Sequence, residues 1–177
     1  MEHPAPAART GERRIEDVLR TEAPHVLGAL VRRFGRFEPA EDAVQEALLA
    51  ASRVWRQDSI PDEARSWLIR VGYRKMVDLI RSEQATRRRE EQVASSNAGL
   101  VDPDRTGPVL HDRDDSLHLL LLCCHPALSE TSQVVLTLRA VGGLTTGEIA
   151  HAYGTTEATM GTRVSRAKQT LRKAGAR

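Results

Sequence analysis

The side chains with the most obvious chemistry lie in LLLLCCHPALSE, residues 119–130, where two adjacent cysteines and a histidine follow a run of leucines. Thiolates and imidazoles bind zinc, and exposed thiols serve as redox switches, so the stretch raises both kinds of site. Structural zinc sites usually have a CxxC-like or HxxxH-like spacing, whereas Cys123 and Cys124 point about 100° apart on a helix. His118 does not lie on the same side as both thiols. The spacing therefore favours the packed end of a helix, with the leucines as its buried side, over a metal site or a redox sensor.

The acidic cluster HDRDD, residues 111–115, is a second candidate for metal chemistry, and it would suit a metal-dependent nuclease. It lies where a linker meets a helix, so Asp114 or Asp115 is expected to begin the helix and Pro126 to end it. No convergent set of acids accompanies the cluster, and no GxxxxGK[ST] phosphate loop occurs in the chain. We therefore expect no catalytic residue, no metal and no cofactor, and the chain is not expected to be an enzyme.

The elements that would position functional side chains are all predicted to be helices. Aromatic residues make up only 3% of the chain and charged residues 28%, and β-branched runs are few. Helical periodicity appears over about 13–34, 39–55 and 62–89, and again over 113–125, 130–141, 145–153 and 156–174. Pro24 falls inside the first segment and is expected to kink or split it. No stretch approaches the length of a membrane span, and a cytoplasmic protein with reduced thiols is expected.

Two small helical domains joined by a flexible linker are predicted. Residues 1–12 lack an apolar signal core and are interpreted as a disordered lead-in. Residues 13–92 form the first domain, and 93–112, rich in Ser, Gly, Pro and Asp, form the linker. The second domain covers residues 113–177.

One face of the second predicted helix is acidic. Asp42, Gln45, Glu46 and Leu49 share an outward face at helical spacing, and no basic residue lies between Glu38 and Ser52. Such a face suits a basic protein surface, with Leu49 as the apolar contact, and does not suit phosphates. A solvated helix face is the alternative that this helix alone leaves open.

The third predicted helix reverses the sign of charge. Arg70 and Arg74 are four residues apart and repel each other unless an anion lies nearby. Trp67 precedes them, and bases stack on aromatic side chains while basic side chains follow the backbone, a pattern typical of single-strand binding. A core position is the alternative for Trp67.

A helix-turn-helix is the strongest local signal, in GLTTGEIAHAYGTTEATMGTRVSRAKQTLRK. Thr145 and Glu148 complete a capping box, Gly154 lies at the turn, and Thr155 or Thr156 caps the last helix. From Thr156 to Arg177 there are six basic side chains and one acidic one, which suits the DNA major groove. Arg166 is predicted to reach a guanine edge, and Arg163 and Lys168 to hold phosphates. A solvated basic helix in a bundle is the alternative.

This order of an acidic helix, a basic helix, a linker and a helix-turn-helix resembles the extracytoplasmic-function sigma factors of the sigma-70 family, which are bacterial RNA polymerase initiation subunits. AEDAVQEALLAASRVW resembles their core-binding helix, and ARSWLIRVGYRKMVDLIRSE resembles the segment that reads and melts the −10 element. The final helix-turn-helix resembles the region that reads the −35 element. Gly161 lies where many members have a basic residue.

The resemblance implies three sets of contacts. Asp42, Gln45, Glu46 and Leu49 would dock on the clamp helices of the polymerase β′ subunit. The loop at 57–63 would capture a flipped −10 base, and the −10 contacts would be Asp58, Ser59, Ile60, Trp67, Arg70 and Arg74. The −35 contacts would be Thr159, Thr162, Arg163, Ser165, Arg166 and Lys168. The polymerase β flap and promoter DNA complete the implied partners, and no membrane partner is implied.

Regulation is also implied by the resemblance. DDSLHLLLLCCHPALSE resembles a subgroup whose members usually carry a C-terminal helical-repeat extension, which residues up to Arg177 do not include. An anti-sigma factor or a regulatory extension is the expected regulatory partner. The alternative to a sigma factor is a dimeric helix-turn-helix regulator that binds duplex DNA without being a polymerase subunit, and it assigns no role to the acidic-then-basic helix order.

Overall fold

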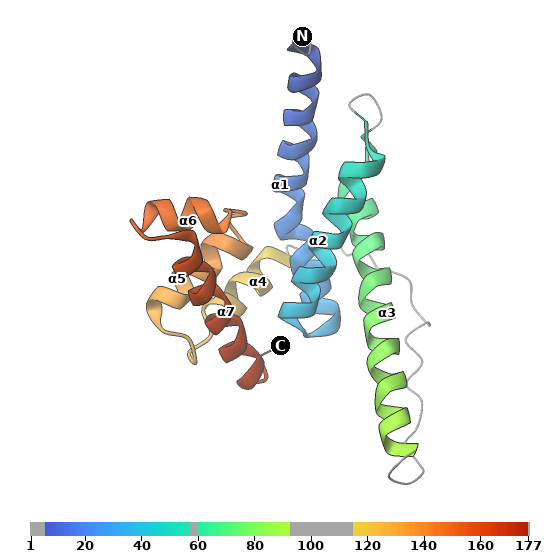
Figure 1. Cartoon of the computed structure of the whole chain (residues 1–177), viewed down its shortest axis with the longest axis vertical. Helices are drawn as coiled ribbons and strands as arrows, with labels where there is room; N and C mark the ends of the chain where they lie inside the picture. Colours follow the sequence, from blue (N-terminus) through green and yellow to red (C-terminus); the bar gives the residue numbers. More distant parts are fainter. Residues whose placement is uncertain (1–5, 57–59, 93–114, 177) are drawn as a thin grey trace.

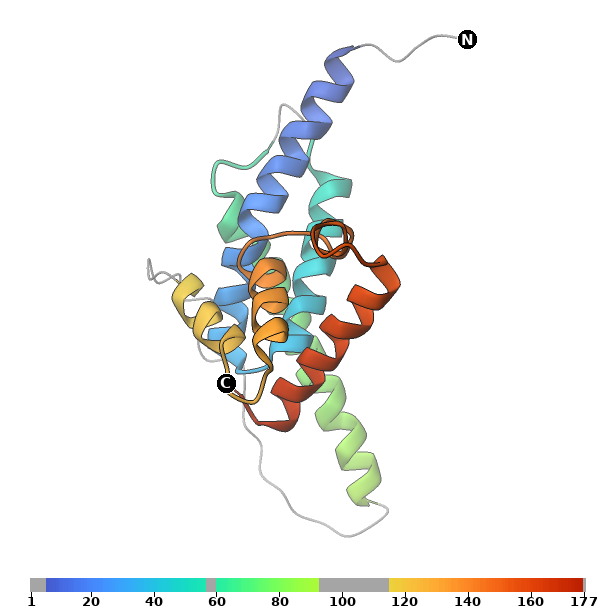
Figure 2. The same ribbon diagram turned by 90° about the vertical axis from the view of Figure 1, so that its left-hand side faces the viewer.

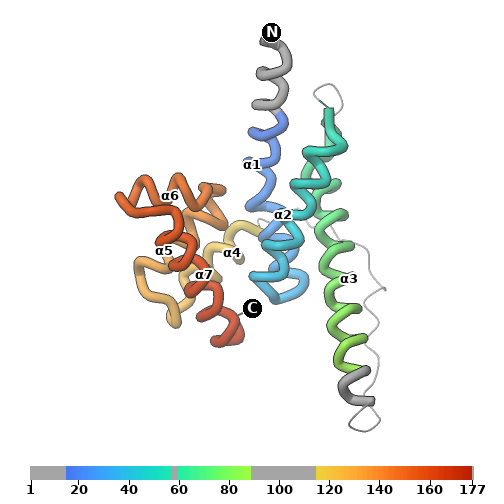
Figure 3. The backbone as a smooth tube through the Cα atoms, viewed as in Figure 1, coloured from blue at the N-terminus to red at the C-terminus, as the bar shows by residue number. Residues whose placement is uncertain are grey.

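The computed structural model describes residues 6–56, 60–92 and 115–176, with side chains over 15–56, 60–88 and 115–176. Every regular element within these ranges is a helix, so the predicted all-α fold is confirmed (Figures 1 and 3). Residues 1–5 of the predicted lead-in and the predicted linker, 93–112, lie outside the described residues. Residues 6–12 of that lead-in are helical, so the first helix begins earlier than its predicted start at about residue 13.

Three long helices form the first domain. They are α1 (Pro6–Phe34), α2 (Phe37–Val54) and α3 (Ala64–Gln92), and each packs on the other two. Pro24 lies inside α1 and does not divide it into two helices, in contrast to one of the expected outcomes. The apolar stripe of α2 is buried as its periodicity predicts, from Ala40 through Val44 and Ala47 to Trp55.

Four shorter helices form the second domain. They are α4 (Asp115–Cys123), α5 (Glu130–Ala140), α6 (Thr146–Ala152) and α7 (Glu157–Lys173), all within a few residues of their predicted positions. Met160, Val164, Ala167 and Leu171 form the buried face of α7, which packs on α5 and α6.

The two domains pack against each other, and their buried side chains join in one continuous hydrophobic cluster. The contact is closest between α1 and α4, where a Cβ atom at Gly28 would lie 2.8 Å from the backbone oxygen of Asp115. Glycine at this position therefore permits the approach of the two backbones. In the view of Figure 2, α7 crosses in front of the first domain, and it also contacts α2.

Candidate protein and nucleic-acid interfaces

The helix-turn-helix is built by the local signals that its sequence carries. Thr145 Oγ1 accepts a hydrogen bond from the Glu148 amide at 3.1 Å, and the Glu148 carboxylate accepts from the Thr145 amide at 2.7 Å. The Thr145 amide and the Thr145 hydroxyl, which donates to the same carboxylate at 2.9 Å, hold the pKa of the Glu148 carboxyl below its usual value, with a smaller effect from Arg20. Gly154 has a φ of 59°, and Thr156 caps α7 by accepting from the Thr159 amide. The capping box, the turn and the second of the two alternative caps are thus as predicted.

The outward face of α7 is open to solvent. Among the six predicted −35 contacts, the exposed ones are Thr159, Thr162, Arg163, Ser165 and Arg166. The Thr162 hydroxyl donates to the Ala158 carbonyl at 3.0 Å, and its oxygen still has capacity to accept. The helix therefore presents basic and hydroxyl groups on one side, which is the donor and acceptor set that reads base edges and phosphates.

Lys168 differs from the other five predicted contacts because it faces the first domain. Its ammonium forms an ion pair with the Glu41 carboxylate of α2. Arg139 of α5 approaches the same carboxylate, with 3.7 Å between Nε and Oε1. Glu41 is only 8% exposed, and sequence analysis did not single it out. The signal was present, because Glu41 lies four residues after Phe37 and three before Val44, on the buried stripe of α2.

The predicted acidic face of α2 is exposed along its length. Asp42, Gln45 and Glu46 are all exposed, and Leu49 is 50% exposed although it is a large apolar side chain. Glu46 pairs with Lys75 of α3 at 3.4 Å, and both side chains remain open to solvent. An exposed leucine flanked by carboxylates is the composition expected of a surface that binds a basic, partly apolar protein.

On α3, the structure separates the predicted −10 contacts into two kinds. Arg70 and Arg74 are exposed, whereas Trp67 and Ile60 are half-buried against the core. Trp67 packs edge-on against Trp55, with 5.3 Å between the ring centroids. Asp58 and Ser59 lie outside the described residues. Trp67 is thus a half-buried residue packed against the core, as one of its two sequence interpretations predicted, and its contact with the −10 strand stays a prediction.

The four leucines before the cysteine pair are not all buried. Leu119 and Leu122 are in the core, but Leu121 is 64% exposed and Leu120 is also open to solvent. The prediction of a leucine-lined buried side was therefore wrong for half of the run. Four consecutive residues on a helix cover every direction around its axis, so they cannot all face one core.

The two cysteines have opposite environments. Cys123 is fully buried, and burial raises the pKa of its thiol to about 12, while Cys124 is exposed. Cys123 is therefore a protonated core thiol near neutral pH. Among the described residues, no group of three His, Cys, Asp or Glu side chains is arranged to hold a metal ion. Over the same residues, no helix is long and apolar enough to cross a membrane.

Comparisons with known proteins agree with this arrangement. The family model for Sigma-70 region 2 matches residues 18–86, and that for Sigma-70, region 4 matches residues 118–171. The ECF RNA polymerase sigma factor SigK of Mycobacterium tuberculosis strain H37Rv is 30% identical over 75% of this chain and 70% of its own length. A probable ECF sigma factor, SigI of M. tuberculosis, is 30% identical over 86% of this chain and 52% of its own length.

A longer relative is also similar. The uncharacterized protein R00370 of Rhizobium meliloti is 37% identical over 86% of this chain, which spans only 36% of that protein. The solved structure of the sigma factor RpoE in complex with the anti-sigma factor NepR from Bartonella quintana aligns with 89% of this chain and 94% of its own. Its sequence identity is 20% and its TM-score is 0.35.

Proposed function

Because this chain belongs to the extracytoplasmic-function RNA polymerase sigma factors, we propose that it binds core RNA polymerase, recognises −35 and −10 promoter elements and initiates transcription. The observation that carries the proposal is the separation of charge. An exposed acidic and apolar face lies on α2, and an exposed basic face lies on a capped recognition helix, α7. One face suits a protein and the other suits DNA, as a subunit that brings polymerase to a promoter requires.

The α2 face is the proposed contact with the β′ clamp helices. Asp42, Gln45 and Glu46 would supply charge and hydrogen bonds, and Leu49 would supply buried apolar area once docked. Their exposure supports this role because docking requires no rearrangement within α2.

A second polymerase contact is proposed on α4. Leu117 is 58% exposed and Leu121 is 64% exposed, and they lie four residues apart on the same side of the helix. An apolar strip of this kind suits the β flap, the second polymerase element that the family resemblance implies. Val134 of α5, 48% exposed, adds apolar area on the next helix.

The proposed DNA contacts fall on both domains. On α7, Arg166 would reach a base edge, Thr159, Thr162 and Ser165 would line the groove, and Arg163 would hold a phosphate. On α3, Arg70 and Arg74 would follow the melted −10 strand. Trp67, which is half-buried, would form part of the floor on which a base rests. Asp58, Ser59 and Ile60 remain the proposed base-capture loop.

Promoter melting in this proposal is driven by binding energy alone. The chain would act without catalysing a reaction, and it would work in the cytoplasm where polymerase and promoter meet. An anti-sigma factor or a regulatory extension remains the proposed source of control.

Binding to purified core RNA polymerase tests the proposal. The variant Asp42→Ala/Gln45→Ala/Glu46→Ala is expected to lose at least tenfold in affinity, because about 1.4 kcal/mol of lost contacts corresponds to that factor. Asp17→Ala/Asp78→Ala is the matched control, since it removes two exposed carboxylates from α1 and α3. Equal loss in both variants would indicate a general charge effect. If the chain ignores polymerase yet binds duplex DNA as a dimer, the regulator alternative replaces the sigma factor proposal.

A further inference from the structure

Glu41 is the single buried charged side chain in the part of the chain that the structure describes. It projects from α2 of the first domain, and both of its cationic partners, Lys168 and Arg139, come from the second domain. Lys168 is itself well covered, with 18% of its side chain exposed. A buried carboxylate that has lost its hydration requires such partners, and both of them reach Glu41 only when the two domains are packed together.

Three further ion pairs connect the domains, two of them at the surface. Arg172 of α7 pairs with Glu38 of α2 at 3.3 Å, and Arg20 of α1 pairs with Glu148 of α6 at 3.2 Å. Arg32 of α1 pairs with Asp115 of α4. The two exposed pairs contribute little individually. The Asp115 side chain is as covered as that of Glu41, at 11% exposed, and the Glu41 carboxylate differs in that two cations of the other domain approach it.

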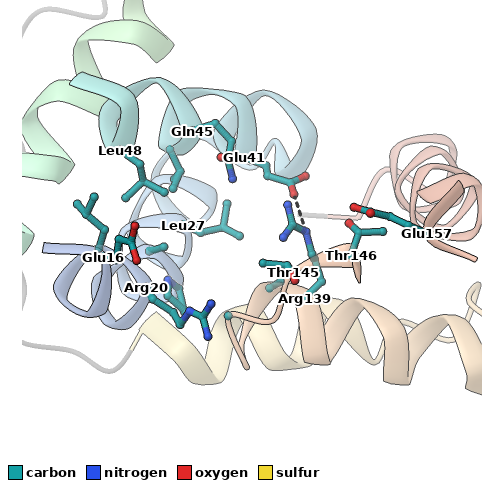
Figure 4. Close-up of a pocket in the computed structure, with 16 residues that line it drawn as sticks. Glu16, Arg20, Leu27, Glu41, Gln45, Leu48, Arg139, Thr145, Thr146 and Glu157 are labelled. Carbon is teal, nitrogen blue, oxygen red and sulfur yellow. Dashed lines mark ion pairs between the residues drawn. The ribbon is translucent and has the colours of Figure 1, made fainter. Parts of the chain in front are cut away.

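The same interface brings the proposed polymerase contacts next to the second domain. Gln45 lines a cavity of about 530 Å³ together with Arg139 and Glu157 (Figure 4). Asp42 lines a second cavity of about 540 Å³ together with Lys168 and Arg172. The N-terminal half of the acidic α2 face therefore borders grooves that residues of α5 and α7 help to line.

We propose that the Glu41, Lys168 and Arg139 cluster is a latch that holds a closed state of the free chain. Lys168 cannot bind a DNA phosphate while it is paired with Glu41. The carboxylates of Glu38 and Asp42, next to α7, repel the same phosphates. A protein that docks on the acidic face of α2 would also contact the second domain, because Asp42 and Gln45 line cavities together with residues of α5 and α7.

The latch couples the two binding events. Polymerase and DNA each bind the open state better than the closed state, so each shifts the population toward the form that the other binds. By linkage, polymerase raises the affinity of the chain for DNA by the same factor by which DNA raises its affinity for polymerase. This coupling rests on the proposed function, whereas the existence of the latch does not.

The variant Glu41→Gln tests the latch because it removes the buried charge and preserves the shape of the side chain. Small-angle scattering of the free chain should show a larger radius of gyration, with the far-UV circular dichroism of the helices unchanged. Glu83→Gln is the matched control, since Glu83 pairs with Arg36 within the first domain and its loss removes the same charge. If Glu41→Gln loses its helical signal, Lys168→Gln takes its place in the scattering measurement. An unchanged radius of gyration in a folded variant overturns the latch, whatever the function of the protein.

A second measurement tests the masking of α7. Binding of the free chain to a fluorescein-labelled duplex of random sequence reports mainly phosphate contacts. Glu41→Gln should bind this duplex about tenfold more tightly than the wild type, a factor within the range typical of coupled sites. The control, Glu83→Gln, should bind it with the affinity of the wild type. A larger radius of gyration without tighter DNA binding would overturn the masking of α7. Failure of both folded variants to bind any duplex would count against the proposed function instead.

Discussion

Gly161 affects the stability of the helix that carries the proposed DNA contacts. It lies within α7, and a Cβ atom added there would meet no atom within 4 Å. Glycine in a helix interior costs about 1 kcal/mol relative to alanine because more backbone entropy is lost on folding. Packing against the rest of the chain therefore does not require a glycine at position 161.

Gly161→Ala should stabilise the protein by about 0.5–1 kcal/mol, because it lowers the entropy of the unfolded chain without a steric clash. Urea denaturation followed by circular dichroism measures the change. Gly154→Ala is the matched control, and it should destabilise the protein, since Gly154 has a φ of 59° that an L side chain adopts only with strain. Stabilisation by both changes would contradict this account.

The cysteine pair should react as one thiol in the folded protein. Cys124 is exposed, whereas Cys123 is buried and has a pKa of about 12, so it holds almost no thiolate near neutral pH. A chromogenic thiol reagent should therefore modify one cysteine rapidly and the other only on unfolding. Cys124→Ser should abolish the rapid phase, and two equal rapid phases would show that Cys123 is accessible.

At the scale of elements, α6 is short and depends on its cap. Thr145 and Glu148 satisfy each other's backbone amides at the start of this helix, and the turn after it positions α7. The position of the proposed DNA-reading face of α7 therefore depends on a pair of hydrogen bonds at the start of α6.

The carboxylate of Glu148 should make the stability of the second domain depend on pH on the acid side. Its hydrogen bonds with Thr145 hold the folded pKa below the unfolded value. Such a group contributes its full stability above the unfolded pKa, and it loses that contribution as the pH falls through the folded pKa. The difference in melting temperature between wild type and Glu148→Gln should therefore shrink as the solution is acidified. Glu130→Gln, with no such cap, is the control, and a constant difference for Glu148→Gln would contradict the prediction.

At the scale of the whole molecule, the two domains meet where the backbones of α1 and α4 lie close together. Gly28 leaves room for the Asp115 backbone, and Arg32 on the next turn of α1 holds the Asp115 carboxylate. The domains thus meet through a steric fit at α1 and through the buried charge of Glu41 at α2.

Gly28→Ala should weaken the contact between the domains, since its Cβ atom would lie 2.8 Å from a backbone oxygen that cannot move independently of α4. Overpacking of this kind typically costs about 1–3 kcal/mol. Thermal unfolding should show a lower midpoint, and scattering should show a larger radius of gyration. Gly161→Ala, which adds the same methyl group in open space, is the control. An unchanged midpoint and radius would show that α1 and α4 do not meet at Gly28 in solution.

Much of the molecule was determined by short-range information in the sequence. Apolar periodicity predicted all seven helices of the described residues, and local hydrogen bonding predicted the capping box at Thr145 and a cap at Thr155 or Thr156, of which Thr156 is the cap. These features depend on residues only a few positions apart, so the sequence alone carries enough physics to place them.

The tertiary structure decided what each helix faces. The leucine run of α4 was predicted to be buried as a whole. A helix turns its residues in all directions, so the packing of α4 against α1 and α5 decides that Leu119 and Leu122 are the buried ones. Lys168 was predicted to face phosphates, and its partner here is Glu41, more than a hundred positions away in the chain. No local pattern encodes such a pairing, because it depends on how two separately predicted domains come together.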